Sequence, residues 1–250
     1  MASLETAPTL LVGDNWPDFG LVDSGHGRKL ERYGPHRFIR PDAQAMVKRM
    51  FADTAMTGRF AISAVNSINW ARLMAQVVYY FAAALQLGAP HRKVAFAVPT
   101  GNFGDVFAGY VAHAMGLPIE RLIVATNVND IVARAITSGD YSCGTVTPTA
   151  APSMDIQVSS NFERLLFDAG GRDGAALAEQ MRGFEATRAM QLTNAQREGI
   201  ARLFSAARAD PNDMAQTMRW AYERAGQVLD PHTAIGLHAA RSAIQSATLA

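Results

Sequence analysis

The sequence has 250 residues, of which 49% are hydrophobic and 18% are charged, and its formal net charge is +1. This composition argues against a disordered chain, and it supplies no basic field for nucleic acid. A single cysteine excludes an internal disulfide, and six scattered histidines lack the spacing of a metal site. The longest apolar run, residues 77–85, is far shorter than the roughly 20 residues that span a bilayer. We therefore expect a cytoplasmic protein that is neither secreted nor membrane-spanning.

Residues 1–41 differ in composition from the rest of the chain. Glycine and proline interrupt short apolar pieces such as FGLVD and HRFIR, which predicts a small, turn-rich β segment. Past Asp42 helical periodicity takes over, and the first helix has an apolar side that carries Ala45, Met46, Met50 and Phe51. The sequence thus predicts two parts, residues 1–41 and residues 42–250.

The second part contains a predicted strand-helix-strand unit. A helix over residues 68–87 comes first; it is apolar on nearly all faces, so we expect it to be buried, and it ends at Gly88. The runs KVAFAV and RLIVAT, residues 93–98 and 121–126, lack polar alternation, as is typical of parallel strands that are covered on both faces. A helix over residues 105–115 joins them through a short, right-handed crossover. The predicted fold class is α/β, with a parallel sheet and flanking helices.

The rest of the chain is predicted to be helical apart from one long loop. A short helix over residues 130–137 precedes residues 139–153, a run rich in Gly, Pro, Ser and Thr that is too long for a simple turn. Long loops in compact domains often carry function, so this loop is a candidate part of a site. Four more helices are predicted over residues 161–167, 177–181, 194–209 and 213–229. Thr193 and Gln196 form a capping-box pair at the start of the third.

The run GNFGD, residues 101–105, follows a buried strand and opens a helix. At this position the first amides of the helix have no partner in the helix, the helix dipole favours an anion, and glycine lets the backbone approach a ligand closely. The spacing therefore predicts a cradle for a phosphate group. The alternative is a tight strand-to-helix turn without a ligand, and Asp105 would repel a phosphate if its side chain pointed inward.

Two further polar clusters are candidates for a site. Asn66, Ser67 and Asn69 open the apolar helix and could bind a carboxylate or a phosphate, but ordinary N-capping of that helix is the favoured interpretation of these residues taken alone. The run DPHTA, residues 230–234, breaks a long helix and places His232 and Thr233 at the start of another, and a helix corner capped by Asp230 is the simpler interpretation. No serine or cysteine partner for His232 is evident, and Cys143 is more typical of an idle thiol than of a nucleophile.

Five runs, in this order, resemble threonine synthase over residues 43–250: VNSINWAR, VPTGNFGDVFAGYVAHAMGLPI, ATNVNDIVARAITSGDY, TPTAAPSMDIQVSSNFERLLFD and LDPHTAIG. Threonine synthases are fold type II enzymes that use pyridoxal phosphate to convert O-phosphohomoserine and water into threonine and phosphate. The resemblance implies part of the large domain of such an enzyme. It implies that Gly101, Asn102, Phe103, Gly104 and Asp105 hold the cofactor phosphate, that Asn66, Ser67 and Asn69 line the substrate site, and that Thr233 lies near the pyridine ring.

The family also needs a lysine that forms the Schiff base with the cofactor, in a segment like TLAFKD. That segment does not occur in this sequence, and none of the three lysines, Lys29, Lys48 and Lys93, replaces it. Lys93 begins the strand whose other end carries the cradle, roughly 20 Å away at about 3.3 Å per residue. We therefore expect no catalytic residue of this kind, and a chain that is incomplete and inactive by itself.

Residues 1–41 resemble the N-terminal extension of a class of S-adenosylmethionine-dependent methyltransferases that includes rRNA-modifying enzymes. No glycine-rich methyl-donor loop follows them, so methyltransferase activity is not implied. The chain is thus expected to be a join of two fragments. Two alternatives stay open, a non-catalytic module that binds a phosphorylated ligand and a chimeric or truncated product without evolved function. A complementary fragment that acts in trans, or self-association through an incomplete sheet, would be its protein partner.

Overall fold

The computed structural model describes residues 19–25, 28–33, 36–41, 52–59 and 68–248. Its contacts group the chain into two units, Met1–Ala64 and Val65–Ala250. In the first unit, three strands form an antiparallel meander in the order β1 (Phe19–Gly25), β2 (Arg28–Tyr33) and β3 (His36–Pro41). The predicted β segment is confirmed, whereas the helix predicted around residues 45–51 lies outside the described residues. A short helix, α2 (Thr54–Arg59), follows.

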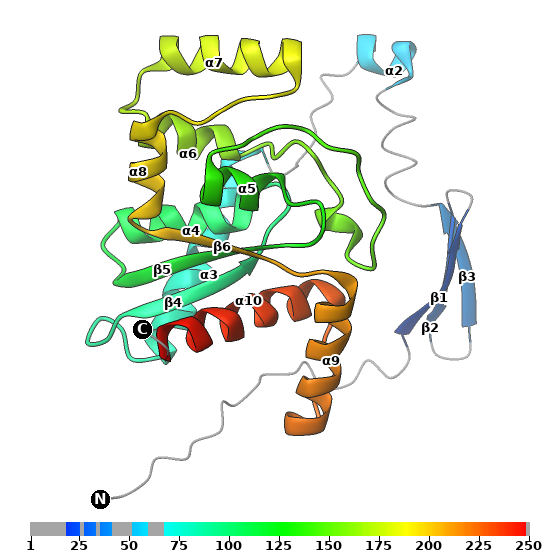
Figure 1. Cartoon of the computed structure of the whole chain (residues 1–250). Helices are drawn as coiled ribbons and strands as arrows, with labels where there is room; N and C mark the ends of the chain where they lie inside the picture. The colour runs from blue at the N-terminus through cyan, green and yellow to red at the C-terminus, as the bar shows by residue number, and fades with distance from the viewer. Residues whose placement is uncertain (1–18, 26–27, 34–35, 42–51, 60–67, 249–250) are drawn as a thin grey trace, which may run out of the picture. The chain divides into compact units, whose positions relative to one another are not determined.

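The second unit is built on a three-stranded parallel sheet, drawn in Figure 1. Its strands are β4 (Val94–Pro99), β5 (Ile119–Thr126) and β6 (Phe204–Arg208), with β5 in the middle. The helix α4 (Gly104–Ala114) connects β4 to β5. The predicted strand-helix-strand unit is therefore confirmed, and the carboxyl ends of both strands meet at one edge of the sheet.

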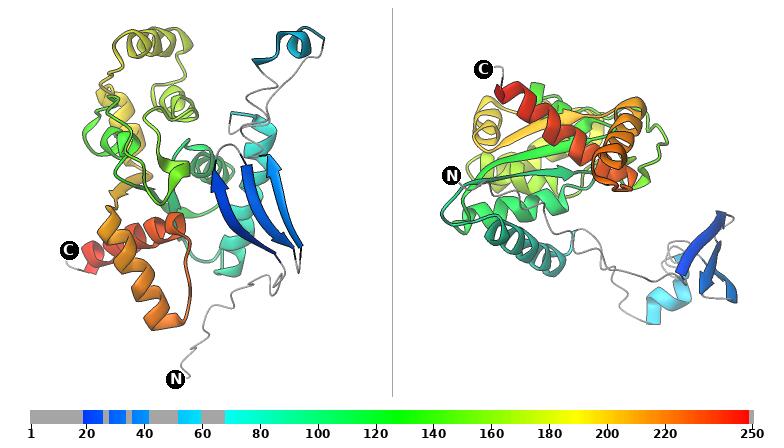
Figure 2. Two further views of the ribbon diagram at one scale, coloured as in Figure 1. Left: turned by 90° about the vertical axis from the view of Figure 1, so that its right-hand side faces the viewer. Right: turned by 90° about the horizontal axis from the view of Figure 1, so that it is seen from below.

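Helices cover both faces of this sheet. Figure 2 shows α10 (Pro231–Thr248) on one face and α3 (Trp70–Gln86) with α4 on the other. The side chains of β5 alternate accordingly, since Leu122 and Val124 join the larger core with α3 and α4, whereas Ile123 and Ala125 join a smaller core under α10. This double covering explains why β4 and β5 are apolar without alternation.

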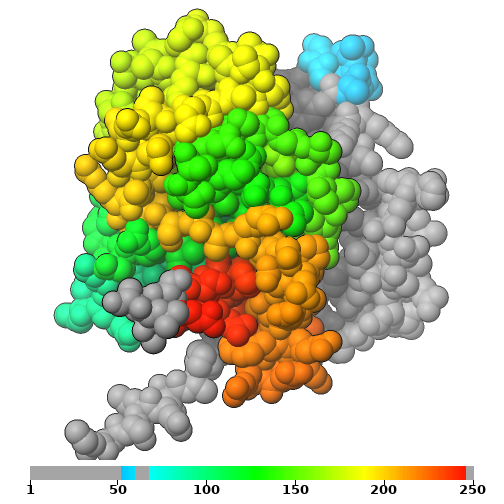
Figure 3. Space-filling model, in the orientation of Figure 1, coloured from blue at the N-terminus to red at the C-terminus, as the bar shows by residue number. Residues whose placement is uncertain are grey.

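Five further helices belong to the described part of the second unit. They are α5 (Ile131–Ser138), α6 (Phe162–Ala169), α7 (Gly174–Thr187), α8 (Asn194–Ala201) and α9 (Pro211–Ala225). The capping box of Thr193 and Gln196 is present at the start of α8. Between α5 and α6 the chain forms the predicted long loop, with one 3-10 turn at Pro152–Met154, and Figure 3 shows the face that carries this loop in green, between α7 and α9.

Two sequence predictions are wrong. Residues 194–209 are not one helix, because the chain leaves α8 at Ala201 and forms β6, which pairs with β5. Its run FSAAR has alanines that favour a helix, so the pairing with β5 overrides the local preference. The helix α3 is not buried all round either, because Met74, Val78 and Tyr79 are more than half exposed while Leu73, Val77 and Tyr80 face the core.

Within the described residues, no helix combines the length and the hydropathy needed to cross a lipid bilayer.

Candidate functional site

The loop between β4 and α4 carries the predicted phosphate cradle. The Thr100 N–H donates to the carbonyl of Ala125 (2.8 Å), so the chain is still tied to β5 when it leaves β4. Phe103 then takes up a left-handed backbone conformation, with φ of 62°, at the N-cap of α4. Its ring is 1% exposed and packs edge-on against Phe162, 5.2 Å between centroids. A buried side chain therefore anchors a loop whose backbone makes a sharp turn.

The carbonyl oxygens of this loop are held by the segment that precedes α6. The Ser159 hydroxyl donates to the Gly101 carbonyl (2.8 Å). The backbone N–H and the side-chain Nδ2 of Asn161 both donate to the Asn102 carbonyl, at 3.1 and 3.0 Å. The Phe103 carbonyl accepts the first hydrogen bond of α4, from Phe107 (3.0 Å). Three consecutive carbonyls thus have partners on the protein side of the loop.

The amide groups of the same loop are unpaired. In the described part of the chain, the N–H groups of Gly101, Asn102 and Phe103 donate to no acceptor. Those of Gly104 and Asp105 lie in the first turn of α4, where a helix offers no acceptor. The dipole of this 11-residue helix adds a positive potential at its N-terminus. Unpaired amides in a turn before a helix are the donor set that phosphate oxygens require.

Gly101 lies where no side chain fits. A Cβ on this residue would be 2.6 Å from the carbonyl oxygen of Ser153, which belongs to the long loop. The Ser153 N–H in turn donates to Nε2 of His232 (3.3 Å), and the His232 ring contacts Asp230 through Nδ1 (2.8 Å). The structure therefore brings together the 101–105 loop, the 152–154 turn and the start of α10.

A polar network fixes the long loop in this place. Both carboxylate oxygens of Asp155 accept hydrogen bonds, Oδ1 from the side chains of Asn127 (2.7 Å), Asn129 (3.0 Å) and Thr149 (2.7 Å), and Oδ2 from the Thr149 N–H (2.8 Å). Asn127 directly follows β5, so this network lies at the same edge of the sheet as the cradle. The loop therefore reaches Gly101 as an ordered segment.

Asp105 lies on the α3 side of the cradle. With Tyr80 and Phe96 it lines a cavity of about 260 Å³ between α3 and β4. The Tyr80 hydroxyl donates to the Asp105 backbone carbonyl (3.0 Å). Although the residue reaches the surface, desolvation raises the pKa of the Asp105 carboxyl, and the Tyr80 hydroxyl opposes part of that rise.

The other predicted site residues have mixed outcomes. Asn66 and Ser67 lie outside the described residues. The Asn69 side chain accepts a hydrogen bond from Ala71 N–H (2.9 Å) and caps α3, as the simpler interpretation expects. Asp230 accepts hydrogen bonds at the start of α10, through Oδ1 from His232 N–H (2.8 Å) and through its backbone carbonyl from Ala234 N–H (3.0 Å), and Thr233 lies exposed in this first turn. The roles assigned to Asn69 and Thr233 at a substrate or cofactor stay predictions.

Of the three lysines, Lys93 is the one that the structure places relative to the cradle. Lys93 precedes β4 at the amino end of the sheet, where its ammonium pairs with Glu120 (2.7 Å). Lys29 lies in β2 of the first unit, and Lys48 is outside the described residues. Lys93 is therefore at the edge of the sheet opposite to the cradle.

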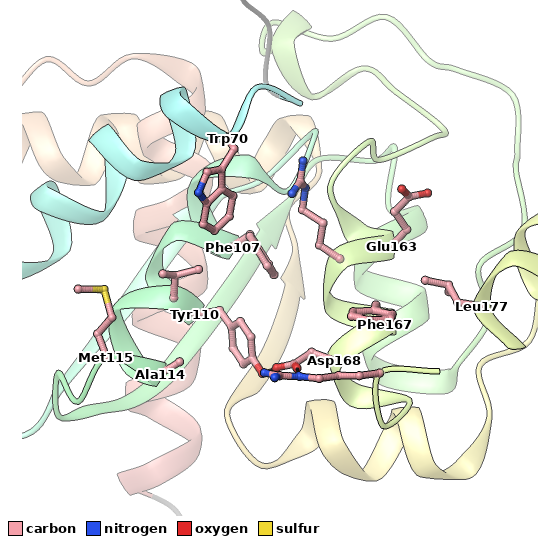
Figure 4. A pocket seen from close by; sticks show the side chains of 12 residues that line it. Trp70, Phe107, Tyr110, Ala114, Met115, Glu163, Phe167, Asp168 and Leu177 are labelled. Atoms are coloured by element: carbon pink, nitrogen blue, oxygen red, sulfur yellow. Dashed lines mark hydrogen bonds and ion pairs between the residues drawn. The ribbon is translucent and has the colours of Figure 1, made fainter. Parts of the chain in front are cut away.

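A larger cavity of about 660 Å³ lies between α4 and α6, away from the predicted site residues. Figure 4 shows Tyr110 directed at Asp168 on the floor of this cavity, with Phe107 and Trp70 on its wall. Asp168 accepts hydrogen bonds from Tyr110 and Arg172, and the Arg164 guanidinium lies 5.7 Å from the Trp70 ring centroid. Asp168, Arg172 and Arg164 thus have partners within the protein, and we assign the candidate site to the cradle.

The sequence by itself does not single out Ser153, Ser159 or Asn161. A signal was present, because all three lie in the run that carries part of the family resemblance. Asn161 looks like an ordinary helix cap, and only the folded chain shows that its side chain reaches the Asn102 carbonyl instead.

Comparisons with known proteins agree with the resemblance. No protein-family model matches the chain. The threonine synthase of Pseudomonas aeruginosa is 53% identical over 205 residues, which cover 82% of this chain and 44% of that protein. The threonine synthase of Corynebacterium glutamicum is 44% identical over 210 residues, covering 80% of this chain and 43% of that one. A crystal structure of a PLP-bound threonine synthase from Brucella melitensis superposes with a TM-score of 0.75 at 53% identity, covering 80% of this chain and 43% of that chain.

These likenesses cover most of the second unit's length and agree in sequence and in fold. The chain spans less than half of the length of the relatives that it matches. Over about four fifths of its own length, this chain is a homologue of the threonine synthases.

Proposed function

We propose that this chain holds the phosphate group of pyridoxal phosphate with the amides of residues 101–105, as part of a threonine-synthase fold. The observation that supports this most directly is the different pairing of the carbonyls and the amides in this loop. The carbonyls of Gly101 and Asn102 accept hydrogen bonds from Ser159 and Asn161, whereas the loop amides have no acceptor in the described part of the chain. A related protein of the same fold is described as PLP-bound. When bound, the cofactor supplies an electron sink for carbanion chemistry at the substrate.

The described residues bind and orient rather than react. The amides of the cradle and the α4 dipole would stabilise the charge of the phosphate, and Gly101, having no side chain, lets the Ser153 carbonyl pack against the loop. His232 and the Asp155 network hold the 152–154 turn behind Gly101. Desolvation raises the pKa of Asp230, but hydrogen bonds from His232 outweigh this and keep that pKa below its usual value.

The family reaction, in which O-phosphohomoserine and water give threonine and phosphate, is the activity to which we assign this site. We propose that the chain does not carry out this reaction alone, because Lys93, the one lysine of the second unit, lies at the opposite edge of the sheet. The cofactor would then be held without a covalent bond. The single cysteine, which is free in the structure, suits a reducing compartment such as the cytoplasm.

Calorimetric titration tests this proposal. We expect heat with pyridoxal phosphate and with pyridoxine 5′-phosphate, which lacks the aldehyde and cannot react with a lysine, but none with pyridoxine. Gly101→Ala should abolish binding, since its methyl group would clash with the Ser153 carbonyl. Gly183→Ala is the matched control, because a Cβ at Gly183 meets nothing within 4 Å.

Two results would contradict the proposal. Heat with nucleotides but with neither pyridoxal phosphate nor pyridoxine 5′-phosphate would favour a module for other phosphorylated ligands. The unpaired amides would serve such a module equally well. Borohydride treatment of the mixture with pyridoxal phosphate, followed by peptide mapping, should label no single lysine stoichiometrically. Stoichiometric labelling of one lysine would show that the chain forms its own covalent link.

A further inference from the structure

We propose that Ser159 and Asn161 are positioning residues, which turn the amides of the 101–105 loop toward the phosphate by holding the carbonyls of Gly101 and Asn102. The inference rests on the proposed function of that loop. In a trans peptide unit the C=O and the N–H point in opposite directions within one plane. A hydrogen bond to the Gly101 carbonyl therefore orients the Asn102 N–H, and a hydrogen bond to the Asn102 carbonyl orients the Phe103 N–H.

This control is needed because the loop contains glycine. Glycine accepts backbone conformations of either sign of φ, so the peptide unit between Gly101 and Asn102 could turn over at little cost. The turned-over unit would direct a carbonyl oxygen at the phosphate in place of an amide. Two oriented donors, the Ser159 hydroxyl at 2.8 Å and the Asn161 Nδ2 at 3.0 Å, oppose this.

The use that Asn161 makes of its side chain supports a role beyond helix capping. Asparagine at an N-cap ordinarily accepts a hydrogen bond from its own helix. Asn161 is at the N-cap of α6 but makes no side-chain cap bond. Its Nδ2 donates to the Asn102 carbonyl instead, and its Oδ1 accepts from Arg164 Nε (3.1 Å). Asn161 is 0% exposed, so water does not compete for these hydrogen bonds.

Ser159 is anchored equally well. Its N–H donates to the Tyr141 hydroxyl (2.8 Å), and the residue is 4% exposed. Tyr141 is itself buried and stacks on Phe162, with 5.1 Å between ring centroids. Donors that are fixed in the core can impose their geometry on a loop that carries glycine.

The test measures the affinity of the full chain for pyridoxine 5′-phosphate and for inorganic phosphate. Ser159→Ala removes one hydroxyl, and we expect about tenfold weaker binding of both ligands, the effect of losing one oriented hydrogen bond. Asn161→Ala should weaken binding by a similar factor. Ser138→Ala is the control, because its hydroxyl bonds the Arg134 carbonyl and has no contact with the loop.

An NMR readout separates positioning from simple loss of structure. In the parent chain, phosphate should shift the amide resonances of Asn102 and Phe103. In Ser159→Ala the Asn102 shift should shrink while the thermal midpoint stays close to that of the parent. Because Asn161 is fully buried and its alanine variant can unfold, the Ser159 variant decides the question.

The outcomes differ for the two proposals. If the parent chain binds neither ligand, the proposed function fails and this inference falls with it. If the parent binds and folded Ser159→Ala binds equally tightly with an unchanged Asn102 shift, only the positioning role is overturned.

Discussion

At the scale of single residues, Asp168 shows how a partly buried carboxylate is stabilised on the surface of α6. It accepts hydrogen bonds from the Tyr110 hydroxyl on α4 and from Arg172, one turn further along. Desolvation raises the pKa of Asp168, but the bonds from Tyr110 and Arg172 outweigh it and hold this pKa below its usual 3.8. Desolvation, followed by the bond to Asp168, raises the pKa of Tyr110 to about 12.

The sign of these pKa shifts predicts a pH dependence. The folded chain favours ionised Asp168, so this stabilisation is fully present above the unfolded pKa and is lost as the pH falls through the lower folded pKa. We expect Asp168→Asn to lower the free energy of unfolding at neutral pH by about 1.5 kcal/mol, the lower end of the range for a hydrogen bond to a charged group, because Arg172 is largely exposed. The difference from the parent should shrink as the pH falls below 3.8.

Urea unfolding at a series of pH values measures this difference. Glu179→Gln is the control, because Glu179 is an exposed carboxyl paired within α7, where an ion pair contributes little. A difference between Asp168→Asn and the parent that stays constant down to the acid transition would contradict the prediction.

At the scale of elements, close packing of α3 on α4 depends on Gly109. A Cβ there would be 2.6 Å from Cε1 and 2.8 Å from Cζ of Tyr80, and 3.0 Å from Leu122. The Tyr80 ring cannot move aside easily, since it is 5% exposed, packs against Phe96 and is tied to α4 by its hydroxyl. The glycine is therefore required by the neighbouring helix rather than by the backbone of α4.

Gly109→Ala should destabilise the second unit. Overpacking costs about 1–3 kcal/mol, and the better helix propensity of alanine offsets up to about 1 kcal/mol of it. Gly183→Ala, in the open middle of α7, should instead gain stability by up to about 1 kcal/mol. Denaturant unfolding of the two variants compares them directly, and equal stability of both would show that Tyr80 yields without cost.

At the scale of the whole second unit, one face of α3 is apolar and exposed. Trp70, Met74 and Val78 recur every four residues and are 47%, 55% and 60% exposed. On the same side of the sheet β4 is an edge strand within the described residues. Contiguous apolar surface of this kind promotes association, because water gains entropy when the surface is covered.

Val78→Lys should therefore reduce self-association without loss of fold. Light scattering as a function of concentration should fall, and the free energy of unfolding should change by no more than about 0.5 kcal/mol, as is usual for an exposed position. Val77→Lys is the contrast, because Val77 is 8% exposed on the core-facing side of α3 and a buried unpaired charge is costly. Scattering of Val78→Lys equal to that of the parent would argue against this face.

The sequence by itself determined the local features of this protein. These features depend on residues close together in the chain, whose preferences can be predicted without the fold. They are the strand-helix-strand unit, the phosphate-type loop at residues 101–105 and the caps at Asn69, Thr193 and Asp230. The family resemblance could be recognised for the same reason, since the sequence runs that carry it are continuous. The resemblance of residues 1–41 to methyltransferases stays a prediction.

Only the tertiary structure decided what distant segments do to one another. Residues 204–208 became a strand because β5 offered a partner, against the helical preference of their alanines. One face of α3 is exposed because no other element of the described chain packs on it. The hydrophobic pattern of a helix does not reveal which elements will cover it. The hydrogen bonds from Ser159 and Asn161 to the 101–105 loop join residues about 58 positions apart. Such contacts arise from packing in three dimensions, so a local pattern contains no sign of them.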